Sequence, residues 1–223
     1  MSKNILIIGF GDIGRRVKSK LDDKYVVYAL NRNPKKEDGV KSFYWDWTSG
    51  NNFNFKGIMF DSIILIPKPS NMNEDGYRIG FIKALANINN SLLNVDFLKL
   101  IAISSTRVYG SEQHGMLNEN IELLPSDFRG SIIKDYEKLL TKTYQKKLII
   151  LRFAGLYDET TKTKPFNRLH RKNAAKAINF FVKNENTDID EHIFNCCEDV
   201  VLDDSKKCIS NIRIKEAGFL FEI

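Results

Sequence analysis

The chain has few of the residues that mark metal-binding, secreted or membrane proteins. Its 223 residues include three cysteines, three histidines and five prolines. Cys196 and Cys197 are neighbours and Cys208 stands apart, so no pair has the Cys-x-x-Cys spacing of a metal or redox site. No apolar run reaches the roughly 18 residues of a membrane span, and the apolar segment after Met1 is too short for a secretion signal. These absences predict a soluble, cytoplasmic protein without a metal site or disulfide framework.

Positive charge exceeds negative charge by six, from 34 Lys and Arg against 28 Asp and Glu. A basic protein can bind nucleic acid, but here the two signs are interleaved along the chain and no nucleic-acid reader motif is present, which argues against that partner. One stretch differs, because residues 162–176 hold six Lys or Arg, one His and no acid. This stretch is either a solvated helix face with a basic loop or a mouth that attracts a phosphate-bearing ligand.

Short apolar segments alternate with helix-like segments, which is typical of βαβ units and a parallel sheet. The predicted strands are 5–8, 25–30, 42–45, 62–66, 98–104, 148–152 and 192–196, and the predicted helices are 13–21, 75–87, 132–145 and 173–183. Residues 63–66 and 148–151 are continuously apolar, as expected of strands that helices cover on both faces. We predict a three-layer, doubly wound α/β domain over residues 1–157 and a reduced C-terminal lobe over 158–223 that closes on it.

A glycine-rich loop follows the first predicted strand and opens the first predicted helix. It reads Gly9-Phe10-Gly11-Asp12-Ile13-Gly14. Gly9 permits the tight turn, Gly11 lets backbone amides approach a pyrophosphate, and Gly14 lets helix and strand pack closely. The first helical turn would then face the phosphates. The loop predicts a Rossmann-type dinucleotide site; the alternative is a plain glycine turn between strand and helix.

The end of the second strand bears on which dinucleotide binds. The chain reads Ala29-Leu30-Asn31-Arg32 there, without the acid that would hold the ribose hydroxyls of NAD. Arg32 could pair with a 2′-phosphate and stack on the adenine, or it could be an ordinary loop arginine. We therefore predict NADP, with NAD as the alternative, and include Asn31 and Arg32 among the cofactor residues.

After the fifth predicted strand the chain reads Ser104-Ser105-Thr106-Arg107-Val108-Tyr109-Gly110. This segment resembles the S-S-x-x-V-Y-G signature of the extended short-chain dehydrogenase/reductases, the superfamily of NAD(P)-dependent nucleotide-sugar epimerases and dehydratases. Segments 60–64, 151–157, 167–170 and 210–219 resemble the same superfamily in the same order. The chain is thus similar, along nearly its whole length, to atypical epimerase-like members.

The resemblance implies roles for matching residues. Ser105 would hydrogen-bond a substrate oxygen beside the nicotinamide, with Thr106 as a neighbouring hydroxyl. A polar cluster at this strand end could equally cap backbone groups. The other implied residues are Asp46, Ile66, Pro67 and Ser104 for the cofactor, and Tyr109, Arg152 and Arg168 for an anionic sugar or nucleotide-sugar.

The catalytic pair of the superfamily, Tyr-x-x-x-Lys on the following helix, is missing. Alignment on Glu137 puts Arg129 at the tyrosine position and Ile133 at the lysine position. Arginine keeps its charge at neutral pH and cannot carry the proton, but it can bind a carboxylate or phosphate through two hydrogen bonds. The candidates for proton transfer are then His170, Tyr109 and Tyr157, of which a histidine best suits neutral pH. His170 could also be structural.

Two functions stay open. The first is an oxidoreductase or epimerase acting on a phosphorylated sugar or nucleotide-sugar, in which Ser105 orients the substrate and Arg129 and Arg168 hold its anion. The second is a cofactor-binding module without turnover that reports NADP(H) to a protein partner, which the missing pair and the small C-terminal lobe favour. Helices at 75–87 and 132–145 often form the dimer face in this superfamily, which makes a homodimer a candidate.

Overall fold

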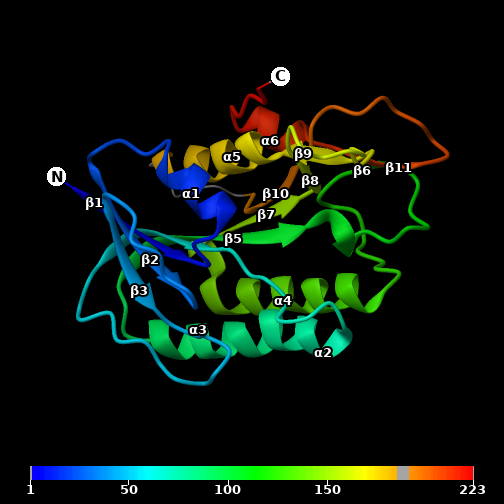
Figure 1. Cartoon of the computed structure of the whole chain (residues 1–223). Helices are drawn as coiled ribbons and strands as arrows, with labels where there is room; N and C mark the ends of the chain where they lie inside the picture. The colour runs from blue at the N-terminus through cyan, green and yellow to red at the C-terminus, as the bar shows by residue number, and fades with distance from the viewer. Residues whose placement is uncertain (1, 185–190, 223) are drawn as a thin grey trace.

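The protein is a three-layer α/β fold with a seven-stranded sheet in the middle (Figure 1). The computed structural model describes residues 2–184 and 191–222. The sheet order is β10-β7-β5-β4-β1-β2-β3, and every neighbouring pair is parallel. Its strands are β1 (Lys3–Ile8), β2 (Tyr25–Asn31), β3 (Val40–Tyr44), β4 (Phe60–Leu65), β5 (Phe97–Ser105), β7 (Leu148–Phe153) and β10 (Ile193–Cys196). The predicted Rossmann-type sheet is confirmed.

Helices cover both faces of this sheet. On one face lie α1 (Asp12–Lys18), α5 (Arg171–Lys183) and α6 (Ile212–Glu216). On the other lie α4 (Phe128–Tyr144) and one long helical segment, in which α2 (Glu74–Tyr77) runs through a π-helical stretch (Arg78–Lys83) into α3 (Ala84–Leu92) (Figure 1). All four predicted helices are present.

The central strands are buried because both of their faces are covered. The side chains of Ile5, Ile7, Ile63, Ile64 and Leu100 are fully inaccessible to water. Each aliphatic side chain of this kind contributes about 1.5–3 kcal/mol when it leaves water. The continuously apolar sequence of these strands is therefore what holds the sheet between its helical layers.

The order of the sheet reverses between β1 and β4, and this determines where a ligand can bind. The chain winds outward from β1 through β2 to β3 on one side and from β4 through β5 to β10 on the other. In such sheets the loops at the carboxyl ends of the strands diverge at the reversal and leave a crevice. The glycine loop and the Ser-Ser-Thr segment follow strands of this central region.

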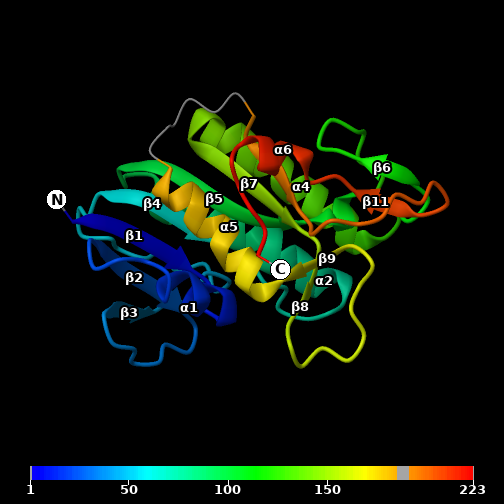
Figure 2. The same cartoon turned by 90° about the horizontal axis from the view of Figure 1, so that it is seen from above.

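Four short strands lie outside the main sheet, at its carboxyl end (Figure 2). They form two parallel pairs, β8 (Gly155–Tyr157) with β9 (Arg168–His170) and β6 (Gly115–Leu117) with β11 (Lys207–Ile209). The helix α5 packs against α1, and β10 pairs with β7. Residues after the predicted boundary at 157 thus complete the Rossmann layers, and only the short strands and loops of 158–223 extend beyond them.

The structure shows the state of the three cysteines and whether a membrane-spanning helix or a metal cluster is present among the described residues. Cys196, Cys197 and Cys208 are buried free thiols, and burial raises the pKa of Cys197 to about 12. Over residues 2–184 and 191–222, no helix is long and apolar enough to cross a bilayer, and no cluster of His, Cys, Asp or Glu has the makeup of a metal site.

Candidate functional site

The glycine loop forms a cradle that side chains would fill. Gly9 has a φ of +95°, and a Cβ at this position would lie 2.3 Å from the carbonyl oxygen of Ile66. A Cβ on Gly14 would lie 3.0 Å from the Phe10 ring. Beside Gly11, in contrast, a Cβ would meet nothing nearer than 4.0 Å, so this side of the loop is open. The arrangement fits close approach of a pyrophosphate to the backbone.

The end of β2 lies beside this loop. The amide of Asn31 donates to the Phe10 carbonyl at 2.8 Å and so ties the loop to β2. After β3, Asp46 accepts hydrogen bonds from the hydroxyl and the backbone N–H of Thr48 at 2.6 and 3.0 Å. The hydroxyl bond, with a smaller contribution from the charge of Arg32, holds the pKa of Asp46 below its usual value. Arg32 and an ionised Asp46 therefore lie near one another beyond the ends of β2 and β3.

The basic stretch at 162–176 is mostly paired with acids. Arg171 bridges Asp12 of the glycine loop, at 3.0 Å, and Asp158, at 3.2 Å. Further ion pairs in the described structure are Lys172–Glu159, Lys176–Glu222 and Arg168–Glu198. The stretch therefore anchors α5 to the loops around it, and little of its charge is left to attract a ligand.

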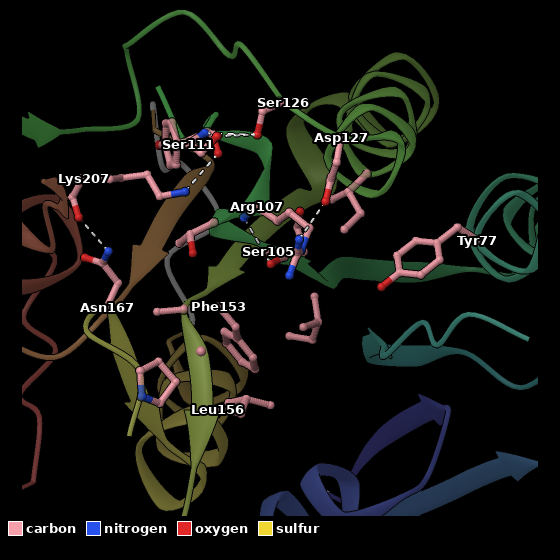
Figure 3. Close-up of a pocket in the computed structure, with 18 of the residues that line it drawn as sticks. Tyr77, Ser105, Arg107, Ser111, Ser126, Asp127, Phe153, Leu156, Asn167 and Lys207 are labelled. Atoms are coloured by element: carbon pink, nitrogen blue, oxygen red, sulfur yellow. Dashed lines mark hydrogen bonds and ion pairs between the residues drawn. The ribbon is translucent and has the colours of Figure 1, made fainter. Parts of the chain in front are cut away.

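A cavity of about 920 Å³ opens at the carboxyl ends of β4, β5 and β7 (Figure 3). It has the size of a small-molecule site and lies where open α/β sheets bind ligands. Five predicted residues line it, namely Pro67, Ser104, Ser105, Thr106 and Tyr109. Four others, Arg129, Arg152, Arg168 and His170, are not among the residues of its wall.

Ser105 is placed to donate a hydrogen bond into the cavity. Its Oγ accepts the N–H of Arg107 at 3.2 Å and so caps the 3₁₀ turn Thr106–Val108. No protein acceptor for its own hydrogen is found among residues 2–184 and 191–222, so this hydroxyl could donate to a ligand oxygen. The Ser104 hydroxyl is used differently, because it donates to Oε1 of Glu137 at 2.5 Å.

Arg152 and Glu137 form a buried pair beneath the cavity. Two guanidinium nitrogens of Arg152 donate to the carboxylate at 2.7–3.2 Å, and Nη1 donates to the Tyr109 hydroxyl at 2.8 Å. That hydroxyl is also within hydrogen-bond distance of the Asn118 carbonyl and Oδ1 of Asn195. Burial raises the pKa of Tyr109. Arg152 therefore supports the cavity from below, and its predicted substrate contact would require this pair to open.

The position that the sequence resemblance aligns with the superfamily's lysine holds an isoleucine, Ile133. Ile133 lines the cavity and is buried. The guanidinium carbon of Arg129 lies over the rings of Phe128 and Tyr77, 5.5 and 5.9 Å from their centroids. Gly130, which lies between Arg129 and Ile133 in the sequence, packs against the 106–108 turn, since a Cβ on it would lie 2.6 Å from the Arg107 carbonyl oxygen.

His170 is the N-cap of α5. Its Nδ1 accepts the N–H of Lys172 at 3.2 Å, and its ring packs edge-on against Tyr157. Tyr157 in turn donates to Glu198 at 2.8 Å, and burial together with this carboxylate raises the pKa of Tyr157. Both side chains belong to a polar cluster around β8 and β9 rather than to the cavity wall.

Several wall residues were not predicted. Tyr77 reaches the cavity from α2, and among the described residues nothing hydrogen-bonds its hydroxyl (Figure 3). Arg107, Asp127 and Lys207 bring charge to the wall. Arg107 stands at an unspecified position (x) of the S-S-x-x-V-Y-G segment, and its place in this segment was the one sequence signal that could have identified it as a wall residue. The remaining residues carry none, because they reach the site from other parts of the chain.

Comparisons with known proteins identify the fold. No protein-family model and no curated protein sequence matches the chain. Solved structures match it closely in shape, and among them are proteins described as an NAD-dependent epimerase/dehydratase, a UDP-glucuronic acid 4-epimerase and a glucuronic acid dehydrogenase. The predicted resemblance is confirmed at the level of the fold.

Three of these structures span most of the chain. A Methylobacillus flagellatus protein assigned as an NAD-dependent epimerase/dehydratase is 20% identical with a TM-score of 0.76, over 99% of this chain and 93% of its own. Glucuronic acid dehydrogenase from Chromohalobacter salexigens is 12% identical with a TM-score of 0.76, over 100% and 85%. UDP-glucuronic acid 4-epimerase from Bacillus cereus, solved with NAD, is 14% identical with a TM-score of 0.67, over 88% and 77%.

Proposed function

We propose that the chain binds a nicotinamide dinucleotide along the glycine loop. The supporting observation is the cradle itself, in which Gly9 and Gly14 have no room for a side chain while the space beside Gly11 is open. Arg171 neutralises Asp12, which would otherwise repel a pyrophosphate at this loop. When bound, the cofactor would supply hydride acceptance and donation.

We propose NADP(H) as the preferred form. The strand β2 ends on Asn31 and is followed by Arg32, so this strand end has no carboxylate for ribose hydroxyls, and the Asn31 amide is already bonded to the Phe10 carbonyl. Arg32 would pair with a 2′-phosphate. Titration of the purified protein with NADPH and with NADH, followed by nicotinamide fluorescence, should give tighter binding of NADPH. Clearly tighter binding of NADH would overturn this preference.

We propose that the protein acts as an oxidoreductase or epimerase on a sugar or nucleotide-sugar. The observation that carries this proposal is the Ser105 hydroxyl, which has a hydrogen free to donate on the wall of a cavity large enough for a sugar. Two proteins of the same fold are named for uronic acid substrates, a glucuronic acid dehydrogenase and a UDP-glucuronic acid 4-epimerase. Ser105 would hold the oxygen of the reacting carbon, with Thr106 beside it.

We propose Tyr77 as the proton carrier in place of the missing tyrosine. Of the phenols on the cavity wall, that of Tyr109 is hydrogen-bonded to Arg152, whereas that of Tyr77 has no hydrogen-bond partner among the described residues. The guanidinium carbon of Arg129 lies 5.9 Å from the centroid of the Tyr77 ring, so a cation stands beside this phenol. General acid–base catalysis of this kind contributes about 10²–10⁴-fold in rate.

One experiment tests cofactor binding and catalysis separately. Cofactor affinity is measured first. NAD(P)⁺ reduction is then followed at 340 nm with D-glucuronate, UDP-glucuronate and UDP-glucose, and epimer formation from the two nucleotide-sugars, which leaves no net reduction, is followed by NMR. Saturable cofactor binding with substrate-dependent reduction or epimer formation would support an enzyme. Binding without turnover of any sugar would contradict the catalytic part, and no binding would contradict the whole proposal.

A further inference from the structure

Two cations on the cavity wall have one carboxylate between them. Arg107 follows β5 and pairs through Nη1 with Oδ2 of Asp127 at 2.9 Å. Lys207 reaches the wall from β11, and its Nζ donates to the backbone carbonyl of Tyr109 at 3.1 Å. No carboxylate of the described residues lies within ion-pair distance of this Nζ. The local charge is therefore one positive unit in excess.

Lys207 is held in this place by its backbone. The side-chain amide of Asn167 donates to the Lys207 carbonyl at 2.7 Å, and its oxygen accepts the N–H of Ile209 at 2.9 Å. Lys207 also pairs with Gly115 in the two-stranded sheet of β6 and β11. Figure 3 shows Asn167 beneath the strand that carries Lys207. The ammonium is thus presented by a fixed strand rather than by a loose loop.

The positive charges of Arg107 and Lys207 repel each other. Partial burial and the charge of Arg107 lower the pKa of Lys207, while Asp127 acts in the opposite direction. Bringing two like charges together on a partly desolvated wall is unfavourable unless an anion joins them. The Nε and Nη2 groups of Arg107 have no protein acceptor among the described residues and stay free for such an anion.

The geometry points to a subsite, formed by Arg107 and Lys207, that binds the carboxylate of a sugar acid. This inference rests on the proposed function and names its substrate class. A carboxylate carries one negative charge and would neutralise the excess on this wall. A phosphate monoester carries about −1.5 to −2 at neutral pH and would leave the subsite negative beside Asp127. Guanidinium and ammonium groups together suit the two oxygens of a carboxylate.

The position of the subsite also gives it a role in specificity. Arg107 and Ser105 line the same cavity, so an anion on the Arg107 guanidinium and an oxygen on the Ser105 hydroxyl would belong to one ligand-sized space. A neutral sugar of the same shape would leave the one excess positive charge of this wall without a counter-ion. The subsite would therefore select sugar acids over neutral sugars.

The test is calorimetric titration of the cofactor-saturated protein with D-glucuronate, D-glucose and glucose 6-phosphate. Glucuronate should bind more tightly than either of the others. Lys207→Met should weaken glucuronate about tenfold or more, as expected for loss of one charged hydrogen bond, and should leave glucose unaffected. Lys207→Arg should restore most of the affinity. Lys206→Met is the matched control, because it removes the same charge from the adjacent, exposed lysine that pairs with Asp203.

The outcomes are distinguishable from failure of the proposed function. Each variant is first checked for thermal unfolding and NADPH affinity, both of which should match the parent protein. Equal affinity for glucuronate and glucose, or equal losses in Lys207→Met and Lys206→Met, would overturn the subsite while cofactor binding stands. Tighter binding of glucose 6-phosphate that depends on Lys207 would overturn the assignment to a carboxylate.

Discussion

The buried pair of Glu137 and Arg152 links the helix α4 to the strand beneath the cavity, and Glu137→Gln perturbs it with almost no change of shape. The carboxylate accepts three hydrogen bonds from Arg152 at 2.7, 3.0 and 3.2 Å and one from Ser104 at 2.5 Å. Glutamine keeps one oxygen and turns an NH₂ group toward a donor. The guanidinium, 2% exposed, then stays charged without a counter-ion.

Loss of one partner from a buried ion pair costs about 3–5 kcal/mol, because the other charge is left unpaired in a medium of low polarity. For a domain of this size each kcal/mol lowers the melting temperature by about 2–4 °C. We therefore expect Glu137→Gln to melt about 6–20 °C below the parent protein. The assay is urea unfolding followed by circular dichroism, with thermal melting as a second measurement.

The matched control is Glu74→Gln, which breaks the exposed i,i+4 pair with Arg78, where both side chains are more than half exposed. Such a pair contributes at most about 0.5 kcal/mol. If Glu137→Gln lost less than about 1 kcal/mol relative to this control, Arg152 would not depend on Glu137. The direct substrate contact predicted for Arg152 would then become the better interpretation.

Three further predictions concern the cofactor loop, the proton carrier and acid stability. Gly9→Ala should abolish dinucleotide binding, because its Cβ would lie 2.3 Å from a backbone oxygen. The control is Gly50→Ala, which is also at positive φ but has open space around it, and it should only destabilise the fold by about 1 kcal/mol. Retained enhancement of NADPH fluorescence in Gly9→Ala would contradict the role given to Gly9. Tyr77→Phe should lower turnover about 10²–10⁴-fold with unchanged NADPH affinity, and a loss of less than threefold in steady-state rates would exclude Tyr77 as the proton carrier. Partial burial tends to raise the pKa of Asp127, but the Gly130 N–H and Arg107 outweigh it and lower that pKa. Its stabilisation is therefore present above the unfolded value near pH 4 and is lost as pH falls through the folded value. Urea unfolding between pH 3 and 7 should show a shallower acid-side loss in Asp127→Asn, which can still cap α4, and identical pH profiles would refute this.

The layers of the fold could be predicted because their signals are local. Apolar runs such as 63–66 and 148–151 identify buried parallel strands wherever they occur, and observed boundaries differ from prediction by only a few residues. The short strands β6, β8, β9 and β11 were missed, since three residues give no periodicity. Helix α6 has five residues and the same difficulty.

Site residues could be predicted only where several polar side chains follow one another in a single segment of the sequence. Ser105 and Thr106 were found because they lie together at a strand end, and the structure places both on the cavity wall. Tyr77 and Lys207 were not, because they meet the wall from helix α2 and from strand β11, more than a hundred residues apart in the chain. Arg152 shows the converse limit, since its sequence context could not reveal that Glu137 faces it in the core.

The substitution at the usual catalytic pair has a structural counterpart in the cavity. Where the superfamily has lysine on the helix, Ile133 makes the wall apolar, and Gly130 lets the 106–108 turn pack directly on the first turn of α4. That same turn carries Arg107, which lines the cavity together with Lys207. Under the proposed function, these two cations would hold an anion, whereas the apolar Ile133 would give no help to proton transfer. If the protein is the enzyme that we propose, its proton carrier would come from a third element, α2, where the Tyr77 phenol lines the cavity with no hydrogen-bond partner among the described residues.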